Sequence, residues 1–204
     1  MKILILGQSE KFIKIFSELY PNSELVVFSW RCLQANSSIK SDFEIVVVCG
    51  YDYDSYFASF ENFLRVNVYD VIDFLENLTS RTKLIYIDTA DSRRKYTFSR
   101  YLYAKKLLAV ELYESFIKTD FYIIKPNTIV NENNAEIKGG ILTQIVFYFL
   151  INLNLIKTTS RNDIALSIKG GFGKVEAPPC CPIPVLLNWK RTKFLDRLLR
   201  FIYG

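Results

Sequence analysis

The stretch Lys2-Ile3-Leu4-Ile5-Leu6-Gly7 opens the chain with a short apolar run that ends at a glycine. A run without polar alternation is typical of a strand that is buried in a parallel sheet. Phe43 to Cys49, which reads Phe-Glu-Ile-Val-Val-Val-Cys and is followed by Gly50, has the same character. We therefore expect two strands of one sheet, each followed by a glycine at its carboxyl end.

Further strands alternate with helices along the first 130 residues. Apolar residues recur at helical spacing over 12–19, 60–78 and about 101–116, and further strands are expected at 24–28, 83–87 and 121–124. This alternation predicts an α/β fold, a Rossmann-like doubly wound parallel sheet with helices on both faces. We expect one domain over 1–204, the strand order 3-2-1-4-5-6, and a short C-terminal substrate region.

Composition excludes several classes of site. The chain has 204 residues and no histidine, which rules out Ser-His-Asp and Cys-His catalysis and zinc sites that contain histidine. Its four cysteines show neither metal-ligand spacing nor a disulfide framework, so we expect no metal and a reduced, cytoplasmic compartment. The longest apolar stretch, 145–156, is too short for a bilayer span and is expected to form a buried helix.

Charge is unevenly distributed along the chain. Residues 1–88 hold 8 basic and 12 acidic residues, so residues 89–204 hold the remaining 18 of 26 basic and 9 of 21 acidic residues, a net charge of +9. An anionic partner is the natural explanation, although the basic residues form no motif that reads nucleic acid.

The last segment, 186–203, is expected to form a basic amphipathic helix. Its apolar face should be buried and its basic residues should point outward. Three partners for this helix stay open, namely its own domain, another protein, and an anionic membrane surface. The last would make the protein membrane-peripheral. The apolar residues are Leu187, Phe194, Leu195, Leu198, Leu199 and Ile202, and the basic ones are Lys190, Arg191, Lys193, Arg197 and Arg200.

Tyr101 and Lys105 are four residues apart on a predicted helix, and side chains at this spacing share one helix face. An ammonium beside a phenol favours the phenolate and lowers the pKa of the tyrosine. Such a tyrosine can exchange a proton during carbonyl–alcohol chemistry. The alternative is an ordinary amphipathic helix that places an aromatic ring on its core face.

Six segments of the chain occur in the order found in one protein family. They are Lys2 to Gly7, Val46 to Gly50, Arg65 to Asp70, Lys83 to Thr89, Tyr101 to Lys105 and Ile123 to Asn127. Together they resemble the short-chain dehydrogenase/reductase superfamily, nearest its sugar-nucleotide epimerase/dehydratase branch, whose pattern includes V-N-V-x-G, Y-x-x-x-K and I-x-R-P-G.

The resemblance implies roles for named residues. Tyr101 would be the general acid/base, Lys105 would lower its pKa, and Thr89 would bind the reacting oxygen, with Ser92 and Asp88 as alternatives to Thr89. The residues implied in cofactor binding are Gly7, Gln8, Ser9, Ser29, Arg31, Cys49, Gly50, Asn67, Lys105 and Pro126. The segment after the second strand contains Arg31 and no acid, which favours NADP over NAD. Arg31 as a solvated loop residue is the alternative.

One departure from the family pattern leaves two functions open. The family's G-x-x-G-x-x-G turn lets a pyrophosphate approach the backbone, but the corresponding residues here are Gly7, Glu10 and Ile13. The resemblance implies an NAD(P)-dependent oxidoreductase or epimerase that acts on a nucleotide-linked sugar, in surface-polysaccharide biosynthesis, and that forms a homodimer. The departure favours a non-catalytic relative that serves as a binding or assembly protein.

Overall fold

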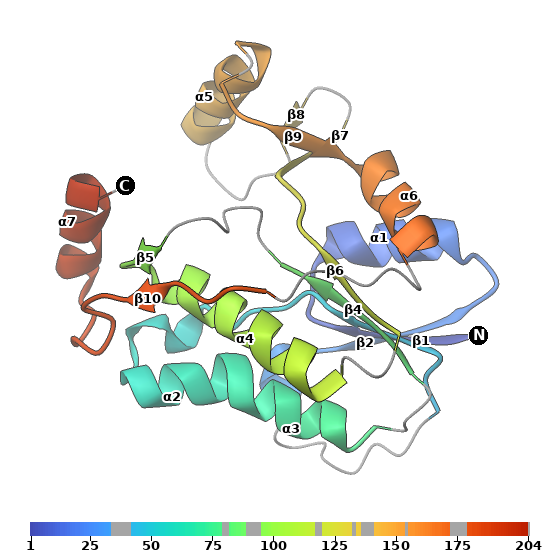
Figure 1. The fold of residues 1–204 in the computed structure, drawn as a ribbon. Coiled ribbons are helices and arrows are strands. Elements are labelled where there is room, and N and C mark those ends of the chain that lie inside the picture. Colours follow the sequence, from blue (N-terminus) through green and yellow to red (C-terminus); the bar gives the residue numbers. More distant parts are fainter. Residues whose placement is uncertain are drawn as a thin grey trace.

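Five parallel strands form the central sheet of the computed structural model, which describes residues 1–33, 42–78, 82–88, 95–116, 120–131, 134–135, 141–153, 155–171 and 179–203. The order of the strands is β2-β1-β3-β4-β6 (Figure 1). Their bounds are Lys2–Leu6 for β1, Glu24–Phe28 for β2, Ile45–Val48 for β3, Lys83–Ile87 for β4 and Phe121–Ile124 for β6. The predicted parallel α/β sheet is confirmed.

Helices cover both faces of this sheet because side chains alternate between its faces along each strand. Leu4 and Leu6 of β1 belong to the core beneath α2 (Phe60–Leu64), α3 (Asp70–Glu76) and α4 (Arg100–Phe116). Ile3 and Ile5 belong to the core of the other face, beneath α1 (Glu10–Leu19) and α6 (Arg161–Gly171). The doubly wound arrangement places β1 inside the sheet and not at its edge.

The strand order differs from the predicted 3-2-1-4-5-6. Counted along the chain, the five strands are ordered 2-1-3-4-5, and β2 and β6 are the edge strands among the described residues. The difference lies in the place of β3, which pairs in parallel with β1 on the side opposite to β2. The connection between β2 and β3 therefore crosses β1 instead of adding a strand beside β2.

The helix predicted over 60–78 is interrupted by a π-helical turn, Arg65–Tyr69, between α2 and α3. The side chain of Asn67, inside this turn, donates to the carbonyl oxygen of Phe63 one turn earlier, at 3.1 Å. A side chain that inserts into the ladder in this way accounts for the local change of pitch. Single π turns often occur at functional sites.

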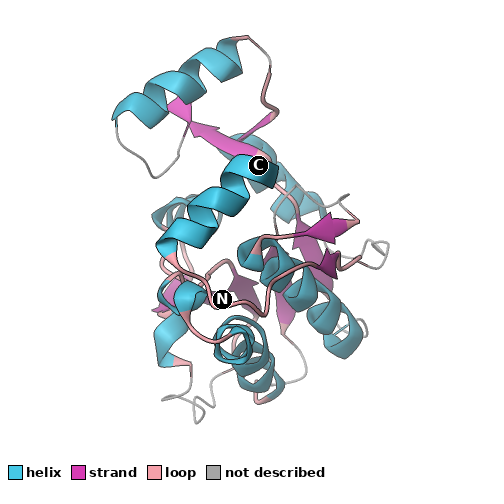
Figure 2. Cartoon of the chain, turned by 90° about the vertical axis from the view of Figure 1, so that its left-hand side faces the viewer, coloured by secondary structure: helices cyan, strands magenta, loops and turns pink. Residues whose placement is uncertain are grey.

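Smaller elements lie outside the central sheet (Figure 2). They are a sheet of β7 (Thr128–Asn131), β8 (Asn134–Ala135) and β9 (Thr158–Ser160), the helices α5 (Ile141–Asn152) and α7 (Lys193–Tyr203), and the pair β5 (Tyr96–Thr97) and β10 (Ile183–Pro184). The expectation that the apolar stretch 145–156 is buried is wrong. Ile145 is 47% exposed, Phe149 is 59% exposed and Leu155 is 67% exposed.

The C-terminal segment also differs from expectation. Its helix begins at Lys193 rather than at 186, because the carbonyl groups of Leu187 and Trp189 accept hydrogen bonds from the buried Arg100. Arg191, predicted to point outward, is buried and donates to the carbonyl of Phe98. Phe194, predicted to be buried, is 77% exposed. Within the described part of the chain, no helix is long and apolar enough to cross a membrane.

Candidate functional site at the carboxyl ends of the strands

Gly7 and Gly50 bring the ends of β1 and β3 into contact. Gly7 has a φ of +122°, and a Cβ atom at this position would lie 2.6 Å from the backbone of Gly50. Its N–H donates to the carbonyl of Phe28 at 2.9 Å. Both the backbone conformation and the close approach require glycine here. The carboxyl ends of parallel strands are where such sheets bind ligands.

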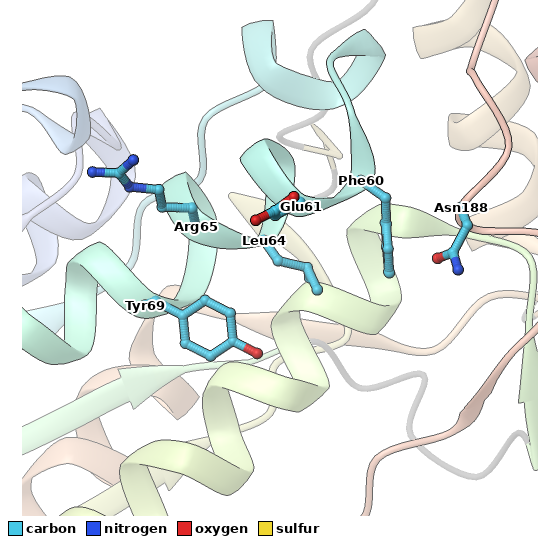
Figure 3. Close-up of a pocket in the computed structure, with 6 residues that line it drawn as sticks. All are labelled: Phe60, Glu61, Leu64, Arg65, Tyr69 and Asn188. Atoms are coloured by element: carbon cyan, nitrogen blue, oxygen red, sulfur yellow. The ribbon is translucent and has the colours of Figure 1, made fainter.

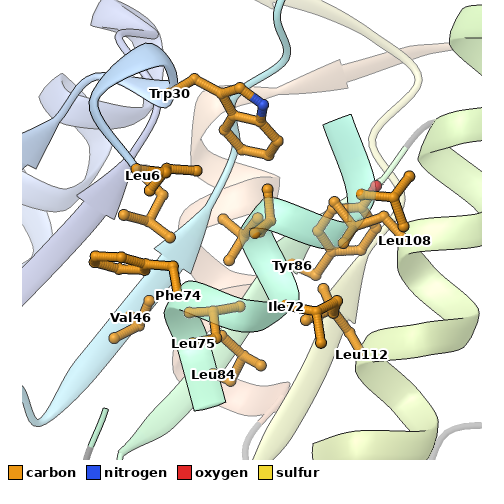
Figure 4. Packing of buried hydrophobic residues seen from close by; sticks show 14 of the residues in the cluster. Leu6, Trp30, Val46, Ile72, Phe74, Leu75, Leu84, Tyr86, Leu108 and Leu112 are labelled. Carbon is orange, nitrogen blue, oxygen red and sulfur yellow. The ribbon is translucent and has the colours of Figure 1, made fainter. Parts of the chain in front are cut away.

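The indole ring of Trp30 covers this glycine pair. A Cβ atom on Gly50 would lie 2.2 Å from a carbon of the ring, so the ring packs directly on Gly50. The indole N–H donates to the carbonyl of Val66 at 3.1 Å, and Trp30 is only 6% exposed. Figure 4 shows the ring beyond Leu6, at the end of the core cluster. The space beside Gly50 is thus filled by the protein itself.

Sequence reasoning did not find this tryptophan. Its neighbours Ser29 and Arg31 were predicted to bind a cofactor, and the available signal was a large aromatic residue between them in the segment after the second strand. Ser29 is half-buried at the start of the 3₁₀ turn Trp30–Cys32 and makes no capping bond with its side chain.

Arg31 forms ion pairs with two carboxylates. Its Nε lies 3.2 Å from Asp52, whose side chain is 8% exposed, and its terminal nitrogen pairs with Asp54. Burial raises the pKa of Asp52, but hydrogen bonds from Ser55 and Arg31 outweigh burial and hold that pKa below its usual value. The guanidinium of Arg31 is therefore paired with two carboxylates of the loop that follows β3.

Asn67 is 1% exposed and its amide is used within the protein. It accepts a hydrogen bond from the N–H of Asp52 at 2.8 Å and donates to the hydroxyl of Ser55 at 2.8 Å. It also donates to Phe63, as described above. Asn67 thus fixes the loop after β3 to the π turn, which is a positioning role.

The turn after β1 carries the predicted Gln8 and Ser9. Gln8 is exposed, and Ser9 is the N-cap of α1 without a side-chain capping bond. The thiol of Cys49 donates to the carbonyl of Leu6 at 3.5 Å. Burial raises the pKa of Cys49 to about 12, so this thiol stays protonated at neutral pH.

Lys105 lies at the strand ends, but its ammonium contacts backbone carbonyls and not the hydroxyl of Tyr101. Nζ lies 3.2 Å from the carbonyl oxygens of both Gly50 and Ile87, and the residue is 5% exposed. Burial lowers the pKa of Lys105 to about 8. The lysine thereby links the ends of β3 and β4.

Tyr101 lies one turn before Lys105, among other aromatic rings. Its ring centroid is 4.7 Å from that of Tyr51 and 6.2 Å from that of Tyr53. Burial, together with the neighbouring Tyr53 and Asp88, raises the pKa of Tyr101 to about 12. The prediction that Lys105 lowers this pKa is wrong in this structure, because the ammonium binds backbone carbonyls and burial dominates.

A buried ion pair completes the site. Nζ of Lys106 lies 2.6 Å from Oδ2 of Asp88, and the two side chains are 3% and 0% exposed. The second oxygen, Oδ1, has no hydrogen-bond partner among the described residues. Thr89 and Ser92, the other candidates for the residue that binds the reacting oxygen, lie outside the described residues. Pro126 is half-buried after β6.

A surface groove lies elsewhere, beside α2 and the π turn (Figure 3). Its volume is about 530 Å³, and none of its lining residues was predicted as a site residue. They are Phe60, Glu61, Leu64, Arg65, Tyr69 and Asn188.

Comparisons with known proteins support the fold. No family model and no curated protein matches the chain. The ADP-L-glycero-D-manno-heptose-6-epimerase of Helicobacter pylori matches with a TM-score of 0.57 and 11% identity, over 84% of this chain and 74% of that one. The UDP-glucose 4-epimerase of Thermotoga maritima, solved with UDP-glucose, matches with a TM-score of 0.55 and 11% identity, over 82% and 72%.

A third solved structure, the dTDP-glucose 4,6-dehydratase of Streptomyces venezuelae with NAD bound, matches over 99% of this chain and 81% of that one, with a TM-score of 0.55 and 14% identity. The chain therefore has the fold of the short-chain dehydrogenase/reductase superfamily and of its sugar-nucleotide epimerases and dehydratases. The fold that the sequence resemblance implied is confirmed.

Proposed function

We propose that the protein is a non-catalytic relative of the epimerase fold, a binding or assembly protein whose dinucleotide cleft is closed by its own Trp30. The observation that carries this proposal is the indole packed on Gly50 and bonded to Val66. In Rossmann-like sheets the adenosine and pyrophosphate of a dinucleotide lie at the first βα turn and the neighbouring strand ends. A buried tryptophan in that place excludes them.

The groups that would hold NAD or NADP are also engaged elsewhere. Arg31, the candidate for a 2′-phosphate, pairs with Asp52 and Asp54. The ammonium of Lys105 binds two backbone carbonyls. Glu10 places a carboxylate in the first turn of α1, where the helix dipole would otherwise favour a phosphate. The residues present do not fit the dinucleotide in this arrangement.

The mouth of the site retains groups that suit a small polyhydroxylated ligand such as a sugar. Tyr53 is 66% exposed and stacks on Tyr101, which offers an aromatic face to the C–H groups of a sugar ring. The hydroxyl of Tyr51 and Oδ1 of Asp88 have no partner among the described residues. Both atoms are buried, so a ligand would reach them only if the side chains above them moved. The exposed aromatic face therefore carries the support for a nucleotide-linked sugar as the ligand class.

A second candidate function is the NADP- or NAD-dependent oxidoreductase or epimerase that the resemblance implied, acting on a nucleotide-linked sugar in surface-polysaccharide synthesis. Tyr101 and Lys105, one helical turn apart at the strand ends beside Asp88, favour it. This candidate requires Trp30 to leave Gly50 and Lys105 to leave its carbonyl partners. The pKa of Tyr101 is about 12. Tyr101 could therefore act as an acid/base near neutral pH only if the ammonium of Lys105 moved beside its hydroxyl and lowered this pKa.

Calorimetric titration with NADPH and NADH distinguishes the two candidates. We expect no binding of either by the native chain at millimolar concentration, and a gain of binding when Trp30→Ala is combined with Glu10→Gly and Ile13→Gly. Binding by the native chain would reject the first proposal in favour of the second.

The proposed sugar ligand has its own test, with UDP-glucose as the probe. We expect binding by the native chain that Tyr53→Ala weakens, because this exposed ring can be removed without disturbing the core. If Tyr53→Ala left the affinity for UDP-glucose unchanged, the proposed role of the Tyr53 and Tyr101 rings in sugar binding would be rejected.

A further inference from the structure

Two helices on one side of the molecule expose large apolar side chains. We call this surface the apolar flank and define it by Ile145, Tyr148, Phe149, Trp189, Phe194 and Leu198, which are 41–77% exposed. It has two parts, which are α7 with the segment before it, at the left of Figure 1, and α5, at the top of the molecule; both are seen in Figure 2. Exposed apolar patches of this kind mark interaction surfaces.

The domain holds α7 with its apolar side outward. Asp196, which is 9% exposed, accepts a hydrogen bond from the hydroxyl of Tyr56 at 2.7 Å and so faces the domain. Phe194 and Leu198 are each two residues away, about 160° around the helix from Asp196. The expected amphipathic helix is therefore present, but Phe194 and Leu198 of its apolar face are turned away from the core, whereas Leu195 is half-buried.

Helix α5 adds an apolar element without acidic or basic residues. No residue of Ile141–Asn152 is Asp, Glu, Lys or Arg, and the exposed Ile145, Val146, Tyr148 and Phe149 lie within an arc of about 160° around the helix. Its 12 residues span about 18 Å, short of the roughly 30 Å hydrocarbon core of a bilayer. A helix of this kind can lie in a membrane interface but cannot cross it.

Positive charge lies beside the α7 part of the flank. Lys190, Lys193 and Arg197 are exposed, whereas Asp196, the acid in the first turn of α7, is turned inward. Trp189 adds a ring of the type that favours the boundary between lipid and water. Apolar side chains with a basic fringe are complementary to an acidic lipid surface, which supplies both an apolar interior and negative head groups.

We propose that the apolar flank docks on the surface of a membrane that contains acidic phospholipids. This inference does not depend on the function proposed for the cleft. It selects one of the three partners that the sequence left open for the C-terminal helix, because Phe194 and Leu198 are exposed on a helix whose other side contacts the parent domain.

Sedimentation with vesicles tests the proposal on the intact chain. We expect the protein to sediment with vesicles of phosphatidylcholine mixed with phosphatidylglycerol, and much less with phosphatidylcholine alone. Binding should weaken with added salt, because exposed charges are screened. Replacing Lys190, Lys193 and Arg197 by glutamine should weaken binding on the order of a hundredfold, at about fivefold for each basic residue.

Paired variants separate the flank from general hydrophobicity. Phe194→Glu with Leu198→Glu should abolish sedimentation. Leu166→Glu, the same change at a leucine of α6 that is 67% exposed, should leave it intact. Light scattering without lipid then reports the oligomeric state. The proposal is overturned if the intact chain does not sediment with the vesicles, or if Leu166→Glu loses sedimentation as much as the α7 variant does. It is also overturned if the chain is a dimer that only the α7 variant dissociates.

Discussion

At the scale of single residues, the buried Lys105 makes stability depend on pH. Its pKa is about 8 in the folded chain and 10.5 when unperturbed, so between these values the unfolded chain holds a proton that the folded chain has lost. Stability should then rise with pH across this window. The change amounts to about 3 kcal/mol. Urea unfolding of the native chain and of Lys105→Met, from pH 7 to 11, measures it as a difference between the two. If the free energy of unfolding of the two proteins changed with pH in the same way, Lys105 would not be a buried group that titrates in this window.

The sequence placed Tyr101 and Lys105 correctly on one helix but could not give the direction of the lysine side chain. That direction depends on the carbonyls of Gly50 and Ile87, which come from two different strand ends. The role of Trp30 was hidden for the same reason, since the ring contacts Gly50 and Val66 only in the folded chain. Contacts between distant segments are not encoded in local spacing.

At the scale of elements, Arg100 fastens the C-terminal segment to α4. Its guanidinium is fully buried and donates to the carbonyls of Tyr56, Ala58, Leu187 and Trp189. Arg100→Met should cost at least about 3 kcal/mol, because four buried acceptors lose a charged donor. It should also speed protease cleavage within 186–192. Arg65→Met, which removes a 66% exposed side chain from an ion pair with the half-buried Asp70, is the control and should change stability by less than about 1 kcal/mol. Equal sensitivity of the two variants would refute the role of Arg100.

The two glycines at the strand ends should respond differently to alanine. A methyl group on Gly50 meets the ring of Trp30, a side chain that can move, and should cost about 1–3 kcal/mol. A methyl group on Gly7 meets backbone atoms at a residue whose φ is +122°, so the cost should be larger. Urea unfolding of Gly7→Ala and Gly50→Ala measures how much stability each variant loses. The reverse order would mean that the strand ends are not in contact as described.

Elements were predictable where one physical pattern dominated. The strands β1, β3 and β4 are buried on both faces and follow from their apolar runs. The burial of α5 and α7 was not predictable, because an apolar face alone does not say whether it meets the core or the outside. Asp196 and Tyr56, 140 residues apart, decide this for α7.

At the scale of the whole molecule, the strand order and a filled cleft distinguish this chain from the pattern that its sequence resembles. The parallel sheet and its two helical layers followed from the alternation of strands and helices. The strand order did not, because it depends on which side of β1 the strand β3 pairs with, a contact between distant segments. The homodimer implied by the resemblance stays a prediction. The light-scattering measurement without lipid, described above, tests it.

The fluorescence of Trp30 tests most directly the claim that this residue closes the cleft. The chain has two tryptophans, and Trp189 is 58% exposed, so Trp189→Phe leaves Trp30 as the only source of indole emission. We predict blue-shifted emission that iodide quenches poorly and that millimolar NADPH leaves unchanged. Emission typical of a solvent-exposed indole, or a shift on adding NADPH, would show that the cleft is open to the dinucleotide and would contradict the account.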